Sequence, residues 1–465
     1  MRTRRSPPLF LVALLAVACA ESRPPDCLLV TVDTLRSDFL SCYGYPRLAT
    51  PRIDALAEAG ALFEQHYTTI ATTAPAHATL LTGLYPREHG LLRNGPPLDP
   101  DVPYLPEFLQ EAGYRTGASI GARVLASRAG FARGFEFFDE DFGESVLKPG
   151  GRNAKYERFA TSVVDRALEF LERDDGRPTF LWVHLYDPHH PFEPPEPSPL
   201  QPNRALEFFA KRAEPSEAFS RSYLATLLAG YEAEVSYTDR QLGRLLDAWD
   251  RRDGAPGSLV VLTSDHGEGL GEHMYEGHGF FLYEEQLRIP LVLRMSGRVP
   301  AAARVTAATS SVDLPATLLD LLGLPAALPG RSLRPDLEGE GSEPERMIFA
   351  ERRAYSDADL ERKEALQALR ERVSGQPGAS SGEKCALVSG DWKLVWNQTG
   401  SHELYNLRRD PREALNLVLE GTDGVDGAQA LLRQVERWRR RAAQRAPVPD
   451  ELDDETRSML DALGY

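Results

Sequence analysis

The chain has 465 residues, enough to bury a large hydrophobic core in two or three domains or in one large α/β enzyme. Its 53 Lys and Arg residues stand against 69 Asp and Glu residues, for a net charge of −16, which argues against nonspecific binding to nucleic acid or anionic lipid. A substrate that carries phosphate or sulfate would therefore need a local source of positive charge, such as a metal ion.

The first residues, MRTRRSPP, contain three arginines and no acidic residue, and the short apolar run LFLVALLAVA then leads to Cys19. This pattern predicts a signal peptide over residues 1–18, too short to span a bilayer stably. The small residues before Cys19 resemble a bacterial lipoprotein signal. We therefore expect an exported protein, in the periplasm or on the outer face of a membrane, with lipid on Cys19 as its only membrane anchor. Leu15 stands one place earlier than usual in such a signal, which leaves simple cleavage without lipidation as the alternative.

Three segments near the start of the mature chain have clear periodicity. The run CLLVTVDTLRSD predicts a buried parallel strand whose carboxyl end carries Asp33. Residues 50–67 have helical spacing, with Thr50 as cap and a proline in the first turn, so we expect a helix there. The stretch TTAPAHATLLTG predicts a second helix that begins near Thr73. This threonine either caps the helix or is a nucleophile held at its N-terminus.

The middle of the chain continues the alternation. We expect helices over residues 156–173 and 231–249, each followed by an apolar strand, FLWVHLYD and SLVVLTSDHGE respectively. Strands that alternate with helices predict an α/β fold over residues 26–335. In that fold, a doubly wound and mostly parallel sheet has helices on both faces.

Ligands of such sheets bind beyond the carboxyl ends of the strands, so Asp33 and the adjacent Asp265 and His266 would share one edge. Neighbouring carboxylate and imidazole groups on a turn can both face one cation, and these donors suit zinc, manganese or another divalent ion. The alternative is that the sequence DHGE only caps a helix. Five of the ten histidines lie in or beside the segments expected at this edge: His77, His184, His189, His266 and His278.

After residue 335 the composition changes. The charged segment 352–384 is punctuated by Gly and Ser, and it predicts a peripheral helical insertion. The stretches CALVSGDWKLVWNQ and SHELYNLRRDP predict short antiparallel strands, and the tail from about residue 422 is polar and helical. We therefore expect residues 336–465 to hold the helical insertion and a small C-terminal antiparallel subdomain.

Several ordered segments resemble the sulfatase branch of the alkaline phosphatase superfamily. They are LLVTVDTLRSDFLSCYGYPRLATPRIDALAEAGALFEQHY, APAHATLLTGLYPREHG, HLYDPHHPFEPP, TSDHGEGLGEHMYEGHG, YEEQLRIPLVL, SSVDLPATLLDLLGLP and ELYNLRRDPREALNL. Together they run from about residue 26 to about residue 417. The resemblance therefore covers most of the chain, and it implies a hydrolase of ester bonds.

The chain departs from the sulfatase pattern at the nucleophile. Sulfatases have Cys/Ser-x-Pro-Ser/Ala-Arg there, and the Cys or Ser is oxidised to formylglycine. This chain has Thr73, whose β-methyl group excludes that aldehyde, and His77 in place of the arginine. Thr34 replaces the second Asp of the usual pair, and His278 stands where sulfatases often have Lys. These changes resemble relatives that use an unmodified threonine, the nucleotide pyrophosphatase-like phosphodiesterases and the phosphoethanolamine transferases.

The resemblance also implies a role for each candidate residue. The ligands of a divalent metal, expected to be zinc, manganese or calcium, would be Asp33, Thr73, Asp265 and His266. Coordination would lower the pKa of the Thr73 hydroxyl, and free N–H groups at the helix start would hold an anionic oxygen. The catalytic group would be Thr73 with His189 and His278, which bind or protonate substrate oxygens. His77 and His184 would contact substrate; the alternatives are helix packing for His77 and a structural role at the strand end for His184.

Four functions fit these residues. The first is hydrolysis of phosphate mono- or diesters through Thr73, and the second is an arylsulfatase-like hydrolysis of sulfated sugars or aryl sulfates. The third is phosphoryl-group transfer, and the fourth is a non-catalytic relative that binds anionic glycans. The expected substrate is a small anionic ester or a sulfated or phosphorylated glycan. The complete set of metal ligands favours an enzyme, because a relative without activity would more often have lost Asp265 or His266.

Overall fold

The computed structural model describes residues 23–143, 156–192, 195, 221–252, 257–339, 346–355, 381–418, 426–441 and 452–463. The expected signal peptide, Cys19 and most of the expected helical insertion lie outside these residues. Within them, no helix is both long and apolar enough to cross a membrane.

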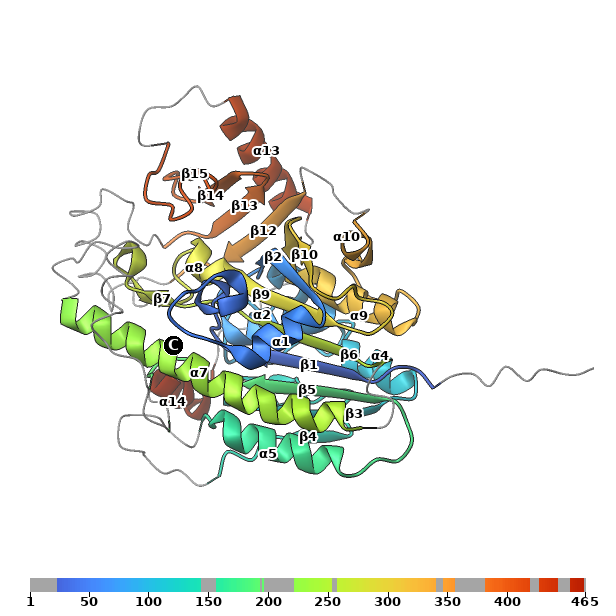
Figure 1. The fold of residues 1–465 in the computed structure, drawn as a ribbon. Coiled ribbons are helices and arrows are strands. Elements are labelled where there is room, and N and C mark those ends of the chain that lie inside the picture. Colours follow the sequence, from blue (N-terminus) through green and yellow to red (C-terminus); the bar gives the residue numbers. More distant parts are fainter. Residues whose placement is uncertain are drawn as a thin grey trace, which may run out of the picture.

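A nine-stranded sheet forms the centre of the molecule, in the order β10-β2-β9-β6-β1-β5-β3-β4, with β11 paired to β2 (Figure 1). Neighbouring strands are parallel except where β9 pairs with β2 and with β6. The bounds are β1 Cys27–Val32, β2 Ala61–Tyr67, β3 Arg115–Ile120, β4 Phe137–Asp139, β5 Thr179–Leu185, β6 Leu259–Ser264, β9 Arg288–Arg294, β10 Ala303–Val305 and β11 Thr309–Ser310. The predicted mostly parallel α/β sheet is confirmed.

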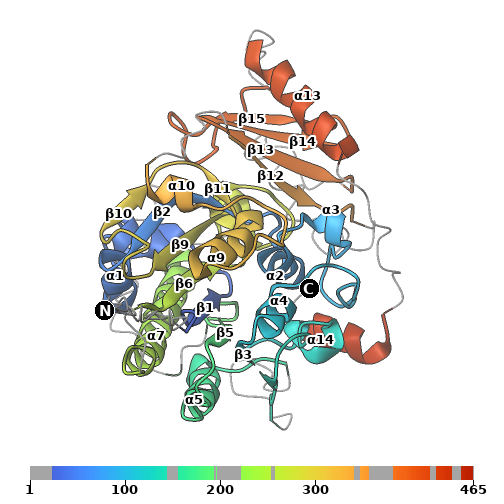
Figure 2. The same ribbon diagram turned by 90° about the vertical axis from the view of Figure 1, so that its right-hand side faces the viewer.

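Helices cover both faces of this sheet (Figures 1 and 2). On one face lie α1 Pro51–Glu58, α5 Ala160–Leu171 and α7 Arg221–Asp250, and on the other α2 Thr73–Thr82, α4 Leu105–Glu111 and α9 Leu314–Leu322. Short elements complete the large sheet unit: α3 Pro86–His89, α8 Glu284–Leu287, α10 Arg334–Leu337, β7 Gly269–Leu270 and β8 Glu276–Gly277. Every residue of β1, β5 and β6 is buried, as strands covered on both faces require.

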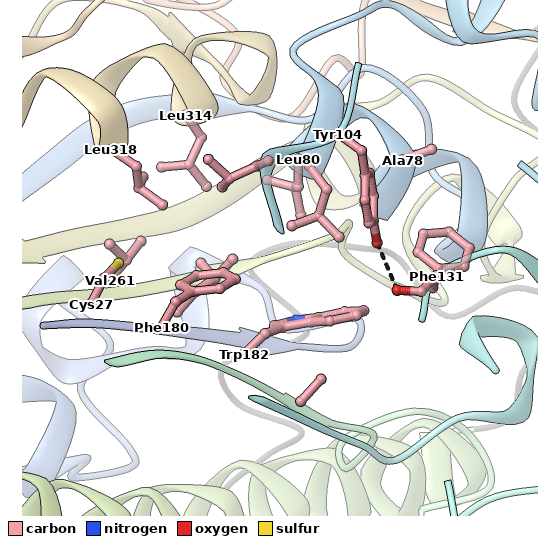
Figure 3. Close-up of a cluster of buried hydrophobic side chains, with 14 of the residues drawn as sticks. Cys27, Ala78, Leu80, Tyr104, Phe131, Phe180, Trp182, Val261, Leu314 and Leu318 are labelled. Carbon is pink, nitrogen blue, oxygen red and sulfur yellow. Dashed lines mark hydrogen bonds between the residues drawn. The ribbon is translucent and has the colours of Figure 1, made fainter. Parts of the chain in front are cut away.

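The core between the sheet and the α2–α9 face is shown in Figure 3. Strand residues such as Cys27, Phe180 and Trp182 pack there against Leu80 of α2 and Leu314 of α9. All five side chains are almost fully buried. This dense packing fixes α2, and with it Thr73, relative to the strand ends.

The expected helix over residues 50–67 is wrong in its second half. Helix α1 ends at Glu58, and residues 61–67 form β2, which pairs with β9 and β10. Gly60 makes the transition, where a Cβ atom would lie 2.1 Å from the carbonyl oxygen of Leu293. The apolar positions of the segment suited either a helix or a strand, and the pairing partners decided between them.

The predicted C-terminal antiparallel subdomain is confirmed (Figure 2). Its four strands are β12 Met347–Arg352, β13 Lys384–Ser389, β14 Trp392–Asn397 and β15 Glu403–Asn406, in sequential antiparallel order. Helix α13, Asp426–Arg441, packs on this sheet through Val435 and Trp438. Helix α14, Asp454–Leu463, instead returns to the large sheet unit, where Met459 joins the core on the α2–α9 side.

Candidate active site

Two adjacent strands of the central sheet bring the acidic residues together. Strand β1 pairs in parallel with β6, with Val32 opposite Ser264, so Asp33 and Asp265 follow at the same edge. The hydroxyl of Ser264 donates to the carbonyl oxygen of Val32 at 2.7 Å and accepts from the backbone N–H of Leu35 at 3.0 Å. These bonds tie the two strand ends to each other and fix the separation of the two carboxylates.

Asp33, Asp265 and His266 form a buried group whose possible ligand atoms all lie within 4.8 Å of one another. Among the described residues, Oδ2 of Asp265 accepts no hydrogen bond, and the Asp33 carboxyl lies near enough to the Thr73 hydroxyl for that contact to lower its pKa. Buried polar atoms are rarely left without a hydrogen bond, and two carboxylates with an imidazole suit a divalent cation such as zinc or manganese. The three residues therefore fit the predicted metal site.

The ring of His266 is oriented for this role. Its Nδ1 lies 3.0 Å from the carbonyl oxygen of Gly267, which can only accept, so Nδ1 carries a proton. Its Nε2 lies 3.4 Å from Oδ2 of Asp265 and 3.5 Å from Oγ1 of Thr73. Metal-ligating histidines usually donate their other ring N–H to such a carbonyl, so the second nitrogen of His266 is aimed at the cation position.

The pKa values of Asp33, Asp265 and His266 are all shifted in the direction that favours protons in this buried site. Burial raises the pKa of Asp33 to about 7, with Glu268 adding to the rise and His266 opposing it. Burial and then the Asp33 carboxylate raise the pKa of Asp265. Burial alone would lower the pKa of His266, but the two carboxylates outweigh it and the pKa rises. The site thus holds protons where a bound cation would replace them.

Thr73 lies at the first turn of α2, fully buried, with its hydroxyl toward His266. The N–H groups that follow Thr73 in the chain are not free. The N–H of Ala74 donates to Oδ1 of Asn94 at 2.8 Å, Pro75 has no N–H, and the N–H of Ala76 bonds within the first turn. Asn94 thus uses the donor that was expected to bind an anionic oxygen.

Three imidazoles form a row beside the carboxylates. The ring centroids of His266 and His278 are 4.4 Å apart, and those of His278 and His189 are 5.2 Å apart. Oε1 of Glu268 lies 3.1 Å from Nδ1 of His278 and orients that ring. Nδ1 of His189 lies 2.9 Å from the Tyr186 hydroxyl and 2.6 Å from the carbonyl oxygen of the next residue. Burial and then His278 lower the pKa of His189 well below its usual value, so this ring is neutral.

The other two candidate histidines lie beneath the carboxylates. Nδ1 of His77 is 2.9 Å from the carbonyl oxygen of Thr73, and its Nε2 is 3.0 Å from Oγ1 of Thr31. Nδ1 of His184 is 3.2 Å from the same Thr31 oxygen, and its Nε2 is 3.5 Å from Oδ2 of Asp33. Both rings are fully buried. Their nitrogens face protein atoms, so the predicted substrate contacts of both rings find no support in this placement.

Sequence reasoning missed two residues of this cluster. Glu268 was visible only as the last letter of DHGE, whose alternative interpretation was a helix cap, and the structure pairs it with His278 instead. Thr31 gave no signal, since a threonine inside an apolar strand is an ordinary strand residue. Its contact with His184 follows from the pairing of β1 with β5, and its contact with His77 follows from the packing of α2 on the sheet.

The chain is similar to known proteins along most of its length. The model of the family described as Sulfatase matches residues 25–324. The N-acetylglucosamine-6-O-sulfatase of Bacteroides thetaiotaomicron is 26% identical, with 88% of this chain and 86% of that protein aligned. The multifunctional alkaline phosphatase superfamily protein PehA of Trinickia caryophylli is 29% identical, with 68% of this chain and 78% of that protein aligned.

Solved structures show the same fold. A protein solved with its substrate D-glucosamine-2-N,6-O-disulfate superposes with a TM-score of 0.70 at 22% identity, over 92% of this chain and all of that one. The phosphonate monoester hydrolase of Agrobacterium radiobacter superposes with a TM-score of 0.69 at 26% identity, over 90% and 95% of the two chains. The similar proteins thus include ester hydrolases named for sulfate esters and for phosphonate esters.

Proposed function

The chain belongs to the sulfatase family, and from this premise we propose that it is an exported, metal-dependent hydrolase of phosphate mono- or diesters. Its nucleophile is unmodified Thr73. One observation carries the proposal. A threonine, which lacks the chemistry to become formylglycine, has its hydroxyl 3.5 Å from His266 Nε2, beside a carboxylate pair that fits a divalent cation.

Four residues of the chain would bind the metal ion. Asp33, Asp265, His266 and the Thr73 hydroxyl hold the metal. When bound, that cation supplies positive charge that lowers the pKa of the Thr73 hydroxyl and offsets the charge of the phosphate group. Asp33 and Asp265 act as ligands in their ionised form, so metal binding releases the protons that burial retains there.

The reaction proceeds in two displacements. Oγ1 of Thr73 releases its hydroxyl proton to solvent and forms a bond to phosphorus while the ester P–O bond breaks. The alcohol leaves with a proton from His278, which Glu268 orients. Water then forms a bond to phosphorus and gives one proton to His278, which returns that ring to its starting state. The bond between phosphorus and Oγ1 of Thr73 breaks, and a proton from solvent restores the threonine hydroxyl. His189 is neutral and its Nδ1 faces a carbonyl oxygen, so its Nε2 can only accept; in this scheme it binds a substrate hydroxyl and leaves proton donation to His278.

Hydrolysis of sulfate esters is the second candidate, since one relative is named an N-acetylglucosamine-6-O-sulfatase and one structural neighbour was solved with a sulfated glucosamine. The chemistry favours phosphorus. A sulfated threonine lacks the elimination route that a formylglycine hydrate offers, so the second step would be slow. The similarity to a phosphonate monoester hydrolase supports phosphorus esters as substrates on this fold.

The test compares matched aryl phosphate, aryl phosphodiester and aryl sulfate after chelation and metal addition. We expect the highest kcat/KM with a phosphorus ester. Thr73→Ala should abolish turnover while the protein stays folded, because it removes only one hydroxyl and one methyl group from the first turn of α2, where Thr72 and not Thr73 is the N-cap residue. Thr73→Ser should keep part of the activity, since the hydroxyl remains.

The control is Thr72→Ala, at a neighbouring threonine whose side chain makes no helix-cap hydrogen bond. It should keep most of the activity. Mass spectrometry of the peptide that contains Thr73 should give the unmodified mass. Full activity of Thr73→Ala would eliminate the nucleophile, and a clear preference for sulfate that is lost in Thr73→Ala would keep the nucleophile but reject the substrate.

A further inference from the structure

A buried polar layer lies between the central sheet and α2, directly beneath the metal ligands. Its members are Thr31 of β1, His77 of α2, and Trp182 and His184 of β5. Each is fully buried, and Figure 3 shows the Trp182 indole in this layer of the core, below α2. Burial of four polar side chains in an otherwise apolar core destabilises the fold unless hydrogen bonds compensate for the lost contact with water.

The hydroxyl of Thr31 is the centre of this layer. The indole Nε1 of Trp182, which can only donate, lies 3.0 Å from Oγ1 of Thr31. Nδ1 of His77 faces the carbonyl oxygen of Thr73 at 2.9 Å and so carries the proton of that ring. Nε2 of His77 therefore accepts the single hydroxyl proton of Thr31 at 3.0 Å, which leaves Thr31 as the acceptor for Nδ1–H of His184 at 3.2 Å.

Both imidazoles that Thr31 orients also reach the predicted metal ligands. Nδ1 of His77 lies 3.6 Å from Oδ2 of Asp265, in addition to its bond to the backbone of Thr73. Nε2 of His184 lies 3.5 Å from Oδ2 of Asp33; it carries no proton in this tautomer, so the ring packs against the carboxyl group without donating to it. The two rings meet edge to face at 4.7 Å, so neither can turn without displacing the other. One hydroxyl thus fixes two rings, and the rings contact three of the four predicted ligands.

We propose that Thr31 is a positioning residue which, through His77 and His184, holds Asp33, Asp265 and the start of α2 in the geometry that binds the cation. The inference rests on the metal site of the proposed function and not on the choice between phosphate and sulfate. Residues that contact the ligands of a metal from outside the coordination sphere typically contribute roughly 10- to 100-fold to its affinity, because they hold the ligands in the orientation that binds the metal.

The experiment measures the Kd for zinc and for manganese by competition with a chromophoric chelator, on the full-length metal-free protein. Thr31→Val keeps the shape of the side chain and removes the hydroxyl, and we expect the Kd for both ions to rise roughly 10- to 100-fold. Thr31→Ser restores the hydroxyl and should return the Kd to within about 3-fold of the wild-type value. This rescue separates the hydrogen bonds from simple packing.

The matched control is Thr116→Val, at a buried strand threonine of β3 whose hydroxyl accepts a hydrogen bond from the N–H of Glu136 at 3.1 Å. Its Kd should stay within about 3-fold of the wild-type value. If Thr31→Val does not fold, His184→Phe, which keeps an aromatic ring in place, should give the same loss of affinity.

Two results would overturn the inference. The first is an unchanged Kd in a folded Thr31→Val or His184→Phe protein. The second is a Thr31→Ser protein that binds as weakly as Thr31→Val, which would assign the effect to packing. Neither result bears on the nucleophile, which the Thr73 variants test separately. Conversely, full activity of Thr73→Ala would reject the proposed mechanism and leave the metal affinities of the Thr31 variants unaffected.

Discussion

Replacing Asp33 with asparagine should stabilise the metal-free protein. Asp33 is fully buried beside Asp265, and burial raises its pKa from 3.8 to about 7. In the metal-free protein this carboxyl is ionised above about pH 7, at a free-energy cost that asparagine avoids. The side chains have nearly the same shape, so Asp33→Asn removes the charge with little change in packing.

The size and sign of the effect follow from the pKa. The unfolded chain ionises Asp33 near 3.8 and the folded chain near 7, so between these values the folded state binds the additional proton. Stability therefore falls as pH rises through this window, by about 1.4 kcal/mol for each pH unit, which gives about 4 kcal/mol at most. Asp33→Asn should equal the wild type near about pH 4 and exceed it by up to about 4 kcal/mol near about pH 8.

The assay is urea unfolding of both chelated proteins at several pH values. Asp101→Asn, at an exposed position, is the control and should follow the wild type throughout. Saturating zinc should reverse the order, because only the wild type keeps all the metal ligands and gains the free energy of binding. A stability difference between Asp33→Asn and wild type that does not change with pH would refute the reasoning about this carboxyl.

Three further predictions concern other parts of the molecule. Lys393→Met should lower the free energy of unfolding by about 3–5 kcal/mol in urea at neutral pH, because the buried amine pairs with Glu284 at 3.0 Å and with Glu413 at 2.9 Å. A loss under about 1 kcal/mol would contradict this prediction. Gly83→Ala should lower the melting temperature more than Gly44→Ala does. Both have positive φ, but a Cβ at Gly83 would lie 2.4 Å from a backbone oxygen and one at Gly44 meets nothing within 4 Å. Chelation should lower the melting temperature, and zinc at about 1,000 times its Kd should restore about 4 kcal/mol of the free energy of unfolding. If a chelator does not change the melting temperature of a metal-loaded sample, that result argues against the metal site.

The sequence by itself determined the sheet class and the edge where the acids meet. Asp33 and Asp265 each follow a continuous apolar run. Such a run is typical of a parallel strand that is covered on both faces, so adjacent residues alone predict the strand. Since parallel strands present their carboxyl ends at one edge, convergence of Asp33 with Asp265 and His266 needed no knowledge of distant contacts. The resemblance of the segment around Thr73 to a family nucleophile was also readable from adjacent residues alone.

The tertiary structure decided what depends on partners far away in the chain. Residues 61–67 form a strand because they pair with β9 and β10. The local periodicity of the segment does not reveal these partners. The N–H of Ala74 was satisfied by Asn94, twenty residues later.

The buried layer of Thr31, His77, Trp182 and His184 beside the predicted metal ligands depends on such partners as well. His77 and His184 were assigned to substrate from their positions in motifs. The register of β1 against β5 instead sets His184 against the hydroxyl of Thr31, and the packing of α2 on the sheet brings His77 to the same hydroxyl. A buried hydrogen bond depends on direction as well as proximity, and only packing of the strands and α2 into one core fixes the directions.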